Sequence, residues 1–360
     1  MALKQLQLQN FRSYFKKEFD FSDQTTLVVG PNASGKTNLL EAIYLLATGK
    51  SFRAELEGEM IGYDQEMAVV SGLLSDRRKL EIILTRGEVI GKRVSKKICK
   101  INGVGKRLSD FIGSLKAVYF GPEDLELVTD SPSIRRKYLD LVLSQVDREY
   151  ARASLSYEKG LRARNKVLEA IRETGAPRAQ LYFWNQLLIK NGTLLTQKRE
   201  EFIDLINKKQ FSALSFQYQI EYDKSIISPA RLEQYKEEEV AAAATLVGPH
   251  RDDWKVKMGE LTGKEDAGRD LSAYGSRGEQ RLAILWLKLC ELAFIKEKTQ
   301  ELPVLLLDDI FSELDEKHRG MVWEVVGEQQ TIITTADVNQ IGPERRKKIK
   351  MIELIRSEEN

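Results

Sequence analysis

The feature that most limits how this chain can fold is a G-x-x-x-x-G-K-T string near its start. It consists of Gly30, Pro31, Asn32, Ala33, Ser34, Gly35, Lys36 and Thr37. The string lies between an apolar run (27–29) and apolar residues at helical spacing (39–43). A glycine-rich turn here leaves backbone N–H groups free, and the helix adds its positive N-terminal end. This context predicts a phosphate-binding loop rather than a glycine turn that only caps a helix.

Two side chains of this loop have expected roles toward a nucleoside triphosphate. Lys36 would reach the β- and γ-phosphates, and the hydroxyl of Thr37 would take one coordination position on Mg²⁺. With two cysteines and two histidines in 360 residues, neither a disulfide framework nor a histidine-based metal site is expected. The chemistry must therefore come from phosphate, Mg²⁺ and carboxylates.

Hydropathy predicts a cytoplasmic globular protein with no membrane partner. No apolar run approaches the ~20 residues of a membrane span, and the first residues alternate like a strand instead of forming a signal peptide's apolar core. With 42% hydrophobic residues, the chain can bury one large core or two smaller ones.

Residues 303–309 form an apolar run that ends in Asp308 and Asp309. A fully apolar strand is typical of the middle of a parallel sheet, whose carboxyl edge presents ligands. This pattern is a Walker B motif, in which Asp308 would hold Mg²⁺ directly or through water. Asp309 would orient or deprotonate the attacking water. Taken alone, the two carboxylates could simply cap the next helix, but the phosphate-binding loop in the same chain favours Walker B.

A third motif begins at Ser276, just before the helical run 282–289. Ser276 and Glu279 have the spacing of a capping box, so a well-capped core helix is a complete alternative reading. That reading does not require Gly278 in the first turn, where glycine costs up to about 1 kcal/mol relative to alanine. A glycine there permits close approach of an anion to the helix end.

These motifs resemble those of ABC-type ATPase heads. Their signature motif is matched by Ser276, Arg277, Gly278, Glu279 and Gln280, and their D-loop by Ser312, Glu313, Leu314 and Asp315. Segments 10–14, 49–53, 120–125 and 248–253 further resemble the RecF family of bacterial recombination mediators, which is related to SMC proteins. The resemblance extends from residue 3 to about residue 340.

The resemblance implies an α/β fold: an ABC-type P-loop ATPase head, with a mixed sheet around the P-loop helix, and an inserted short helical lobe. It implies ATP as the nucleotide, sandwiched between two copies of the chain, so that a homodimer forms when ATP is bound. Ser276 and Gly278 of one copy would contact the γ-phosphate held by Lys36 of the other. Asp315 would lie at the two-fold interface.

Departures from the ABC pattern leave some roles open. Asp309 stands where transporters usually have glutamate, so slow hydrolysis is expected. Residues 122–124 occupy the position of a glutamine that senses Mg²⁺ in many ABC proteins. Arg53 and Thr335 are candidate phosphate sensors, with Asp337 an alternative to Thr335.

The organisation expected from the sequence has three parts: the N-terminal part of the head (1–124), the helical lobe (125–210) and the C-terminal part of the head (211–360). Apolar residues at helical spacing in 134–171 and 178–207 predict the lobe. It is far too short for an SMC arm.

Basic residues are concentrated in two segments. Residues 131–200 hold 14 Lys/Arg against 7 Asp/Glu, and 92–107 hold seven basic residues and no acidic one. Such stripes would neutralise DNA phosphates, although a solvated surface is the plainer alternative. The candidate DNA-binding residues are Lys92, Arg93, Lys96, Lys97, Arg135, Arg136, Arg148 and Arg152. Since no base-reading motif is present, any preference should come from DNA shape or junction geometry.

The resemblance therefore implies an ATP-dependent protein of recombinational DNA repair and replication. It would dimerise on double-stranded DNA or at junctions of single- and double-stranded DNA, and release on slow, DNA-stimulated hydrolysis. RecR, RecO and RecA are implied partners, with loading of RecA at gapped DNA and support of the SOS response. The alternatives are an ATPase of another DNA-maintenance, transport or ribosome-associated system, and an ATPase that drives a nuclease.

Overall fold

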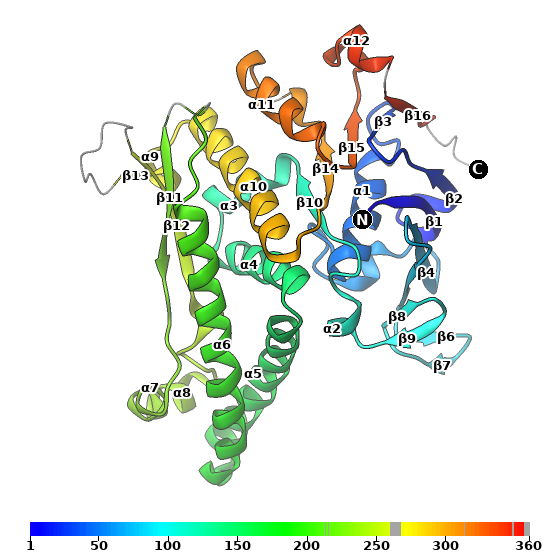
Figure 1. Ribbon diagram of the computed structural model, residues 1–360. Helices are drawn as coiled ribbons and strands as arrows, with labels where there is room; N and C mark the ends of the chain where they lie inside the picture. The colour runs from blue at the N-terminus through cyan, green and yellow to red at the C-terminus, as the bar shows by residue number, and fades with distance from the viewer. Residues whose placement is uncertain (213, 215, 260–267, 313, 348, 356–360) are drawn as a thin grey trace. The chain divides into compact units, whose positions relative to one another are not determined.

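The computed structural model describes the chain except residues 213, 215, 260–267, 313, 348 and 356–360. It divides into two compact units (Figure 1). Unit 1 combines Met1–Asp124 with Glu291–Asn360, and unit 2 is Leu125–Cys290. No described helix is both long and apolar enough to cross a membrane.

Unit 1 contains a parallel sheet that carries the phosphate-binding loop. The strand order is β10 (Ala117–Phe120), β14 (Val304–Asp308), β15 (Thr331–Thr335), β3 (Thr25–Val29) and β16 (Lys350–Glu353). All neighbouring pairs are parallel, and β14 and β15 are buried along their whole length. Helix α1 (Lys36–Thr48) follows β3 and buries nearly all of its side chains. The carboxyl ends of these strands therefore meet beside the N-terminus of α1.

A second sheet of unit 1 is antiparallel, with side chains that alternate between buried and exposed along β5. Its order is β2 (Tyr14–Asp20), β1 (Leu3–Phe11), β4 (Met67–Leu74), β5 (Lys79–Thr85), β8 (Lys97–Ile101) and β9 (Val104–Lys106). A small hairpin, β6 (Glu88–Val89) and β7 (Lys92–Arg93), joins β5 to β8. The short helical elements are η1 (Glu57–Met60), α2 (Leu108–Phe111), η2 (Pro122–Leu125), η5 (Ile310–Ser312), α11 (Glu316–Val326), η6 (Val338–Gln340) and α12 (Pro343–Arg346).

Unit 2 is built on two 27-residue helices, α5 (Arg148–Thr174) and α6 (Leu181–Asn207), which pack side by side (Figure 1). Asp147 caps α5 by accepting from the N–H groups of Glu149 and Tyr150, and Gly175 ends it in the left-handed conformation. The three-stranded sheet is β11 (Gln217–Asp223), β12 (Asp253–Gly259) and β13 (Arg269–Asp270). The other described elements of unit 2 are α3 (Glu126–Thr129), α4 (Pro132–Val146), η3 (Arg178–Gln180), α7 (Pro229–Gln234), α8 (Lys236–Ala242), η4 (Pro249–Arg251) and α9 (Leu271–Tyr274). Helix α10 (Arg277–Thr299) begins in unit 2 and ends in unit 1.

The compact units divide the chain differently from the boundaries expected from sequence. The division after Asp124 coincides with the expected one, but the second falls after Cys290 instead of residue 210. The reason is packing: β11 contacts α6 and pairs with β12, while α8 packs on α5. The described residues between 211 and 290 thus share the core of the helical lobe.

Candidate nucleotide site

The phosphate-binding loop follows β3 and ends where α1 begins, as the sequence predicts. Gly35 precedes α1 with φ of 95°, and a Cβ there would lie 2.8 Å from the hydroxyl of Tyr14, so glycine is required. Lys36 Nζ donates to the carbonyls of Gly30 at 2.7 Å and Pro31 at 2.8 Å. Burial lowers the pKa of Lys36, and the negative charges of Asp309 and Asp308 oppose this shift.

Asp308 lies at the end of β14 and gathers three hydroxyl groups. Its Oδ2 accepts from Thr37 Oγ1 at 2.7 Å and Tyr119 OH at 3.3 Å, and its Oδ1 accepts from Thr334 Oγ1 at 2.5 Å. The hydroxyl and the carboxylate predicted to hold Mg²⁺ are therefore in contact, although 271 positions separate them in the chain. Such a pair suits Mg²⁺, which usually takes one or two protein ligands and completes its shell with phosphate oxygens and water.

Asp309 has a different environment from its neighbour. Its φ is 50°, unusual for an aspartate, and its Oδ1 is buried without a hydrogen-bond partner in the described part of the chain. Burial and the charge of Asp308 raise the pKa of Asp309. A carboxylate with a raised pKa and a free oxygen is suited to accept a proton from water.

Two neighbours of Asp308 were not among the residues predicted from sequence. Tyr119, on β10, links Asp308 to Glu123, which accepts from the tyrosine hydroxyl at 2.5 Å. Burial raises the pKa of Glu123, and the nearby Asp308 and Asp124 add to the shift. Glu123 belongs to segment 122–124, which occupies the position of the Mg²⁺-sensing glutamine of ABC proteins. Thr334 is the second neighbour of Asp308 that the sequence did not predict. Tyr119 and Thr334 could have been found from the expectation that β10 and β15 end at the same sheet edge as β14.

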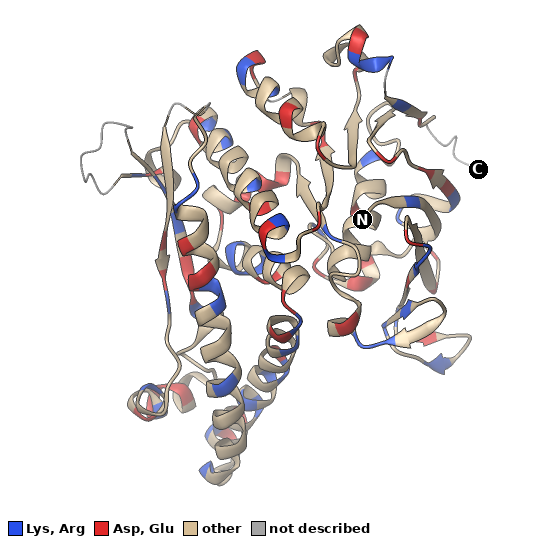
Figure 2. Ribbon diagram, viewed as in Figure 1, with Lys and Arg blue, Asp and Glu red and all other residues tan. Residues whose placement is uncertain are grey.

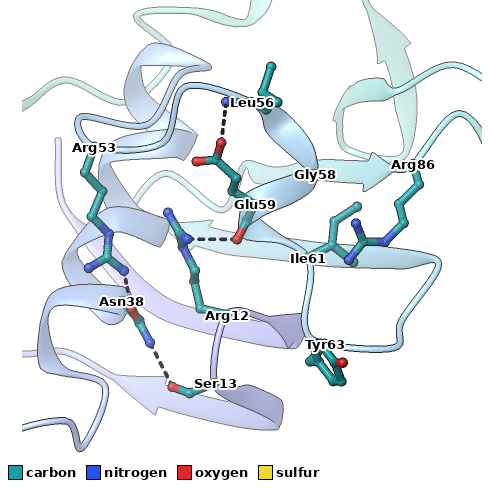
Figure 3. A pocket seen from close by; sticks show the side chains of 10 residues that line it. All are labelled: Arg12, Ser13, Asn38, Arg53, Leu56, Gly58, Glu59, Ile61, Tyr63 and Arg86. Carbon is teal, nitrogen blue, oxygen red and sulfur yellow. Dashed lines mark hydrogen bonds between the residues drawn. The ribbon is translucent and has the colours of Figure 1, made fainter.

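A pocket of about 850 Å³ borders the start of α1 (Figure 3). Its ten lining residues are Arg12, Ser13, Asn38, Arg53, Leu56, Gly58, Glu59, Ile61, Tyr63 and Arg86. Figure 3 shows Arg53 hydrogen-bonded to Asn38, which in turn bonds Ser13, and Arg12 bonded to the carbonyl of Glu59. The three arginines make the pocket suitable for an anion.

Glu41 on α1 holds two of these arginines in place. It is fully buried and accepts from Arg12 at 2.6 and 2.8 Å, from Arg53 at 3.0 and 3.2 Å, and from Ser51 at 2.5 Å. Burial acts to raise the pKa of Glu41, but the bonds from Arg12 and Ser51 outweigh it, so the pKa is lowered. The proposed phosphate sensor Arg53 is thus tied to the phosphate-binding helix through Glu41.

The signature residues lie in unit 2 at the start of α10. Ser276 N donates to Glu279 Oε2 at 2.7 Å and Glu279 N donates to Ser276 Oγ at 3.3 Å, which is the capping box expected from sequence. Gln280 is buried and donates to the carbonyl of Leu271, whereas Arg277 is exposed. The space that a side chain at Gly278 would enter is open. The helix end is therefore accessible to a ligand.

The D-loop residues follow Walker B directly. Ser312 Oγ donates to the carbonyl of Asp309 at 2.7 Å, Leu314 is buried, and Asp315 caps α11 by accepting from His318 N at 2.9 Å. Glu313 lies outside the described residues. The other sensor candidate, Thr335, is buried at the end of β15 and bonds the backbone of Asp337.

The candidate DNA-binding residues fall into two groups. Lys92, Arg93, Lys96, Arg148 and Arg152 are exposed, and Figure 2 shows basic residues on β7 and along α5. The other three have internal partners: Lys97 pairs with Glu57, Arg135 is buried against Asp253 at 2.6 Å, and Arg136 donates to the carbonyl of Asp252 at 2.8 Å. These contacts use some of their N–H donors within the protein, so the exposed residues are the better placed candidates for DNA.

A family model described as the RecF/RecN/SMC N-terminal domain matches residues 2–353. A DNA replication and repair protein RecF from Exiguobacterium sp. is 34% identical, with 99% of this chain and 98% of the relative covered. The chain belongs to the RecF family. Another RecF, from Thermomicrobium roseum, is 37% identical over 89% of each chain.

Solved RecF structures agree with this assignment. A recombination mediator protein RecF, described as RecF-ATP in the RecFOR pathway, has a TM-score of 0.81 and 33% identity. The match covers 93% of this chain and 92% of the solved chain. A second RecF structure has the same TM-score and 32% identity, with 94% of each chain covered.

These matches confirm the predicted fold, an ABC-type P-loop ATPase head with an inserted lobe. They also confirm the predicted identity as a RecF-type DNA replication and repair protein and place the chain in a family of ATPases. With respect to the nuclease alternative, the described residues contain no group of three or more His, Cys, Asp or Glu that could hold a metal ion.

Proposed function

We propose that this RecF-family protein binds ATP with Mg²⁺ in unit 1 and that two copies then close on DNA. The observation that carries the proposal is the 2.7 Å contact between Thr37 and Asp308, since it joins the phosphate-binding loop to the Walker B strand. The relative solved as RecF-ATP supports the choice of ATP.

Different residues around the loop would bind different parts of a triphosphate. Lys36 exchanges one of its carbonyl partners for a phosphate oxygen, and the backbone N–H groups at the start of α1 face the same phosphates. Thr37 and Asp308 would hold Mg²⁺, which neutralises the charge on the phosphates when bound. The arginine-lined pocket beside Asn38 would receive an anionic part of the bound nucleotide.

Hydrolysis is slow in this proposal and acts as a switch. Asp309 accepts the proton of the attacking water, and its short side chain makes it a less favourable base than the glutamate of transporters. Glu123, held by Tyr119 beside Asp308, takes the place of the Mg²⁺-sensing glutamine. Arg53 and Thr335 respond to the γ-phosphate.

The second half of each site comes from another copy of the chain. The open helix end at Ser276 and Gly278 would contact the γ-phosphate held by Lys36 of the second copy. Loss of that phosphate removes the bridge and releases the dimer. Asp315 would lie near the two-fold axis.

DNA is the proposed partner of the basic surfaces, through Lys92, Arg93, Lys96, Arg148 and Arg152. The dimer grips double-stranded DNA or a junction with single-stranded DNA and releases it after DNA-stimulated hydrolysis. Family membership supports RecR, RecO and RecA as partners, with loading of RecA at gapped DNA in the cytoplasm as the outcome and support of the SOS response.

Sedimentation with a non-hydrolysable ATP analogue tests this proposal. The wild-type chain should become dimeric with the analogue and remain monomeric without it. Ser276→Arg should bind nucleotide and stay monomeric, because the larger side chain obstructs the approach of the second copy. Ser133→Arg, a matched change at an exposed serine of unit 2, should dimerise normally. A Ser276→Arg variant that still dimerises would contradict the shared site.

A further inference from the structure

The turn of the β6–β7 hairpin has a residue that conflicts with its geometry. Ile90 and Gly91 connect the two strands, with φ of 49° and 70°. A two-residue turn with positive φ at both positions favours Asn-Gly, and a β-branched residue there is an outlier. The side chain of Ile90 is 85% exposed, so burial in a core does not explain its presence.

The neighbouring β8–β9 hairpin provides an internal comparison. Its turn, Asn102 and Gly103, has φ of 51° and 78°, and therefore the same geometry with the favoured residues. Asn102 Oδ1 also accepts from Lys79 N at 2.8 Å. Two hairpins of unit 1, in separate sheets, thus show the turn with and without the conflict. Conflicts of this kind between a residue and its backbone concentrate at functional sites.

Three exposed cations follow the isoleucine within six positions of the chain: Lys92, Arg93 and Lys96. Among the described residues, none of the three forms an ion pair. The acidic groups nearby are Glu88, which lies across the hairpin from Arg93, and Glu66, whose Oε2 accepts from Ile90 N at 3.0 Å. Glu66 therefore fixes the tip, and the surface around the apolar side chain stays basic (Figure 2).

An apolar tip followed by exposed cations matches a polyanion that also presents an apolar face. DNA has both, in its phosphates and its base pairs, and proteins that read DNA shape insert isoleucine and similar side chains between bases. At a junction of single- and double-stranded DNA, the last base pair already lacks one stacking neighbour. One side chain can therefore cover that pair without separating stacked bases.

We propose that Ile90 is a wedge that packs against the terminal base pair of such a junction while Lys92, Arg93 and Lys96 hold the flanking phosphates. The wedge rests on the DNA binding proposed above and gives it a preferred DNA structure. It also accounts for recognition of a junction by a chain without a base-reading motif.

The test compares the full-length chain on two DNAs of equal phosphate number, a uniform duplex and a junction, with Mg²⁺ and a non-hydrolysable ATP analogue. The wild-type chain should bind the junction at least about fivefold more tightly. Ile90→Asn, which copies the β8–β9 turn and so keeps the hairpin geometry, should bind both DNAs equally. 2-Aminopurine at the terminal base pair should change its fluorescence with the wild-type chain and not with Ile90→Asn.

Two further variants distinguish the wedge from the loss of any exposed apolar side chain and from the loss of a phosphate contact. Val104→Thr removes an exposed β-branched apolar side chain from β9 and should keep the preference. Lys92→Gln should weaken binding to both DNAs alike and reduce the salt dependence by about one released counterion.

The outcomes distinguish the two levels of the proposal. If Ile90→Asn keeps the junction preference, the wedge is wrong while the proposed ATP-dependent DNA binding stands. If the wild-type chain binds neither DNA with the analogue, the proposed function itself fails. Binding of the wild-type chain to anionic lipid vesicles but to neither DNA would identify the hairpin as a membrane contact and overturn the wedge.

Discussion

At the scale of single residues, two adjacent aspartates differ because their surroundings differ. Asp308 accepts hydrogen bonds from three hydroxyl groups, which hold its carboxylate in the place where a cation would bind. Asp309 has an unpartnered oxygen and a pKa raised by burial and by Asp308. The first is therefore placed to bind and the second to accept a proton.

Asp309→Asn should reduce ATP hydrolysis by about 10²- to 10⁴-fold, because the base is lost while the shape of the side chain is kept. Nucleotide binding and dimerisation should persist. In the wild-type chain, acid protonates the base, and the raised pKa means that the rate falls at a higher pH than for an ordinary aspartate. Steady-state phosphate release measured against pH checks both effects; an unchanged rate in the variant would exclude Asp309 as the base.

A second residue-scale prediction concerns Glu41. Glu41→Gln removes the buried charge that holds Arg12 and Arg53, and should destabilise the protein by about 2 kcal/mol and lower ATP affinity. Glu55→Gln, at an exposed carboxylate of the same region, is the control. Thermal unfolding and titration with a fluorescent ATP analogue measure the two effects. Equal affinities in the two variants would show that the arginine pocket does not receive nucleotide.

At the scale of elements, a half-buried histidine connects η4 to α5. His250 Nε2 donates to the carbonyl of Thr245 at 2.9 Å, so its Nδ1 is the acceptor for Tyr157 OH at 2.8 Å. Burial lowers the pKa of His250 to about 4, and the positive charges of Arg251, Arg136 and Arg164 add to the shift. The motif 248–253, noted in the sequence only for its resemblance, thus packs against α5.

Because of His250, we expect the folding stability of unit 2 to decrease in acid. As pH falls below about 6.5, the unfolded chain binds a proton that the folded chain takes up only near pH 4, so folding stability decreases. The loss should reach about 3 kcal/mol at pH 4. His250→Gln should show a smaller decrease of the unfolding temperature between pH 7 and pH 5 than the wild-type chain. The same slope in both proteins would exclude His250 as the source.

At the scale of the whole molecule, the chain folds as two units that carry different halves of the proposed reaction. Unit 1 contains the phosphate-binding loop, Walker B and the arginine pocket, whereas unit 2 contains the signature motif. Ligand binding in unit 1 should therefore be measurable without dimerisation. ATP at a hundred times its dissociation constant should stabilise the protein by about 2.7 kcal/mol.

Lys36→Met should abolish this stabilisation, because the ammonium group that faces the phosphates is lost. Ser276→Arg should retain it, since the signature motif lies in unit 2. Differential scanning fluorimetry of both variants with Mg²⁺ and a non-hydrolysable analogue gives the comparison. Stabilisation of Lys36→Met equal to that of the wild-type chain would place the nucleotide elsewhere.

The phosphate-binding loop, the Walker B strand and the capping box at Ser276 could all be predicted from the sequence. Each of these depends on residues close in the chain, and local backbone chemistry decides its form. The sequence also identified residues 92–107 as basic. It did not reveal that Ile90 occupies a left-handed position, because no local pattern predicts a β-branched residue there.

The partners of side chains that are distant in the sequence become visible once the chain is folded. Tyr119 joins Asp308 across 189 positions, and Arg135 pairs with Asp253 across 118, so neither contact has a local signature. Contacts between distant segments also explain why unit 2 ends at Cys290 and not at residue 210, the boundary expected from the sequence. Motifs that bind phosphate through their own backbone can be read from sequence, whereas charges neutralised by distant partners depend on how the sheets and helices pack.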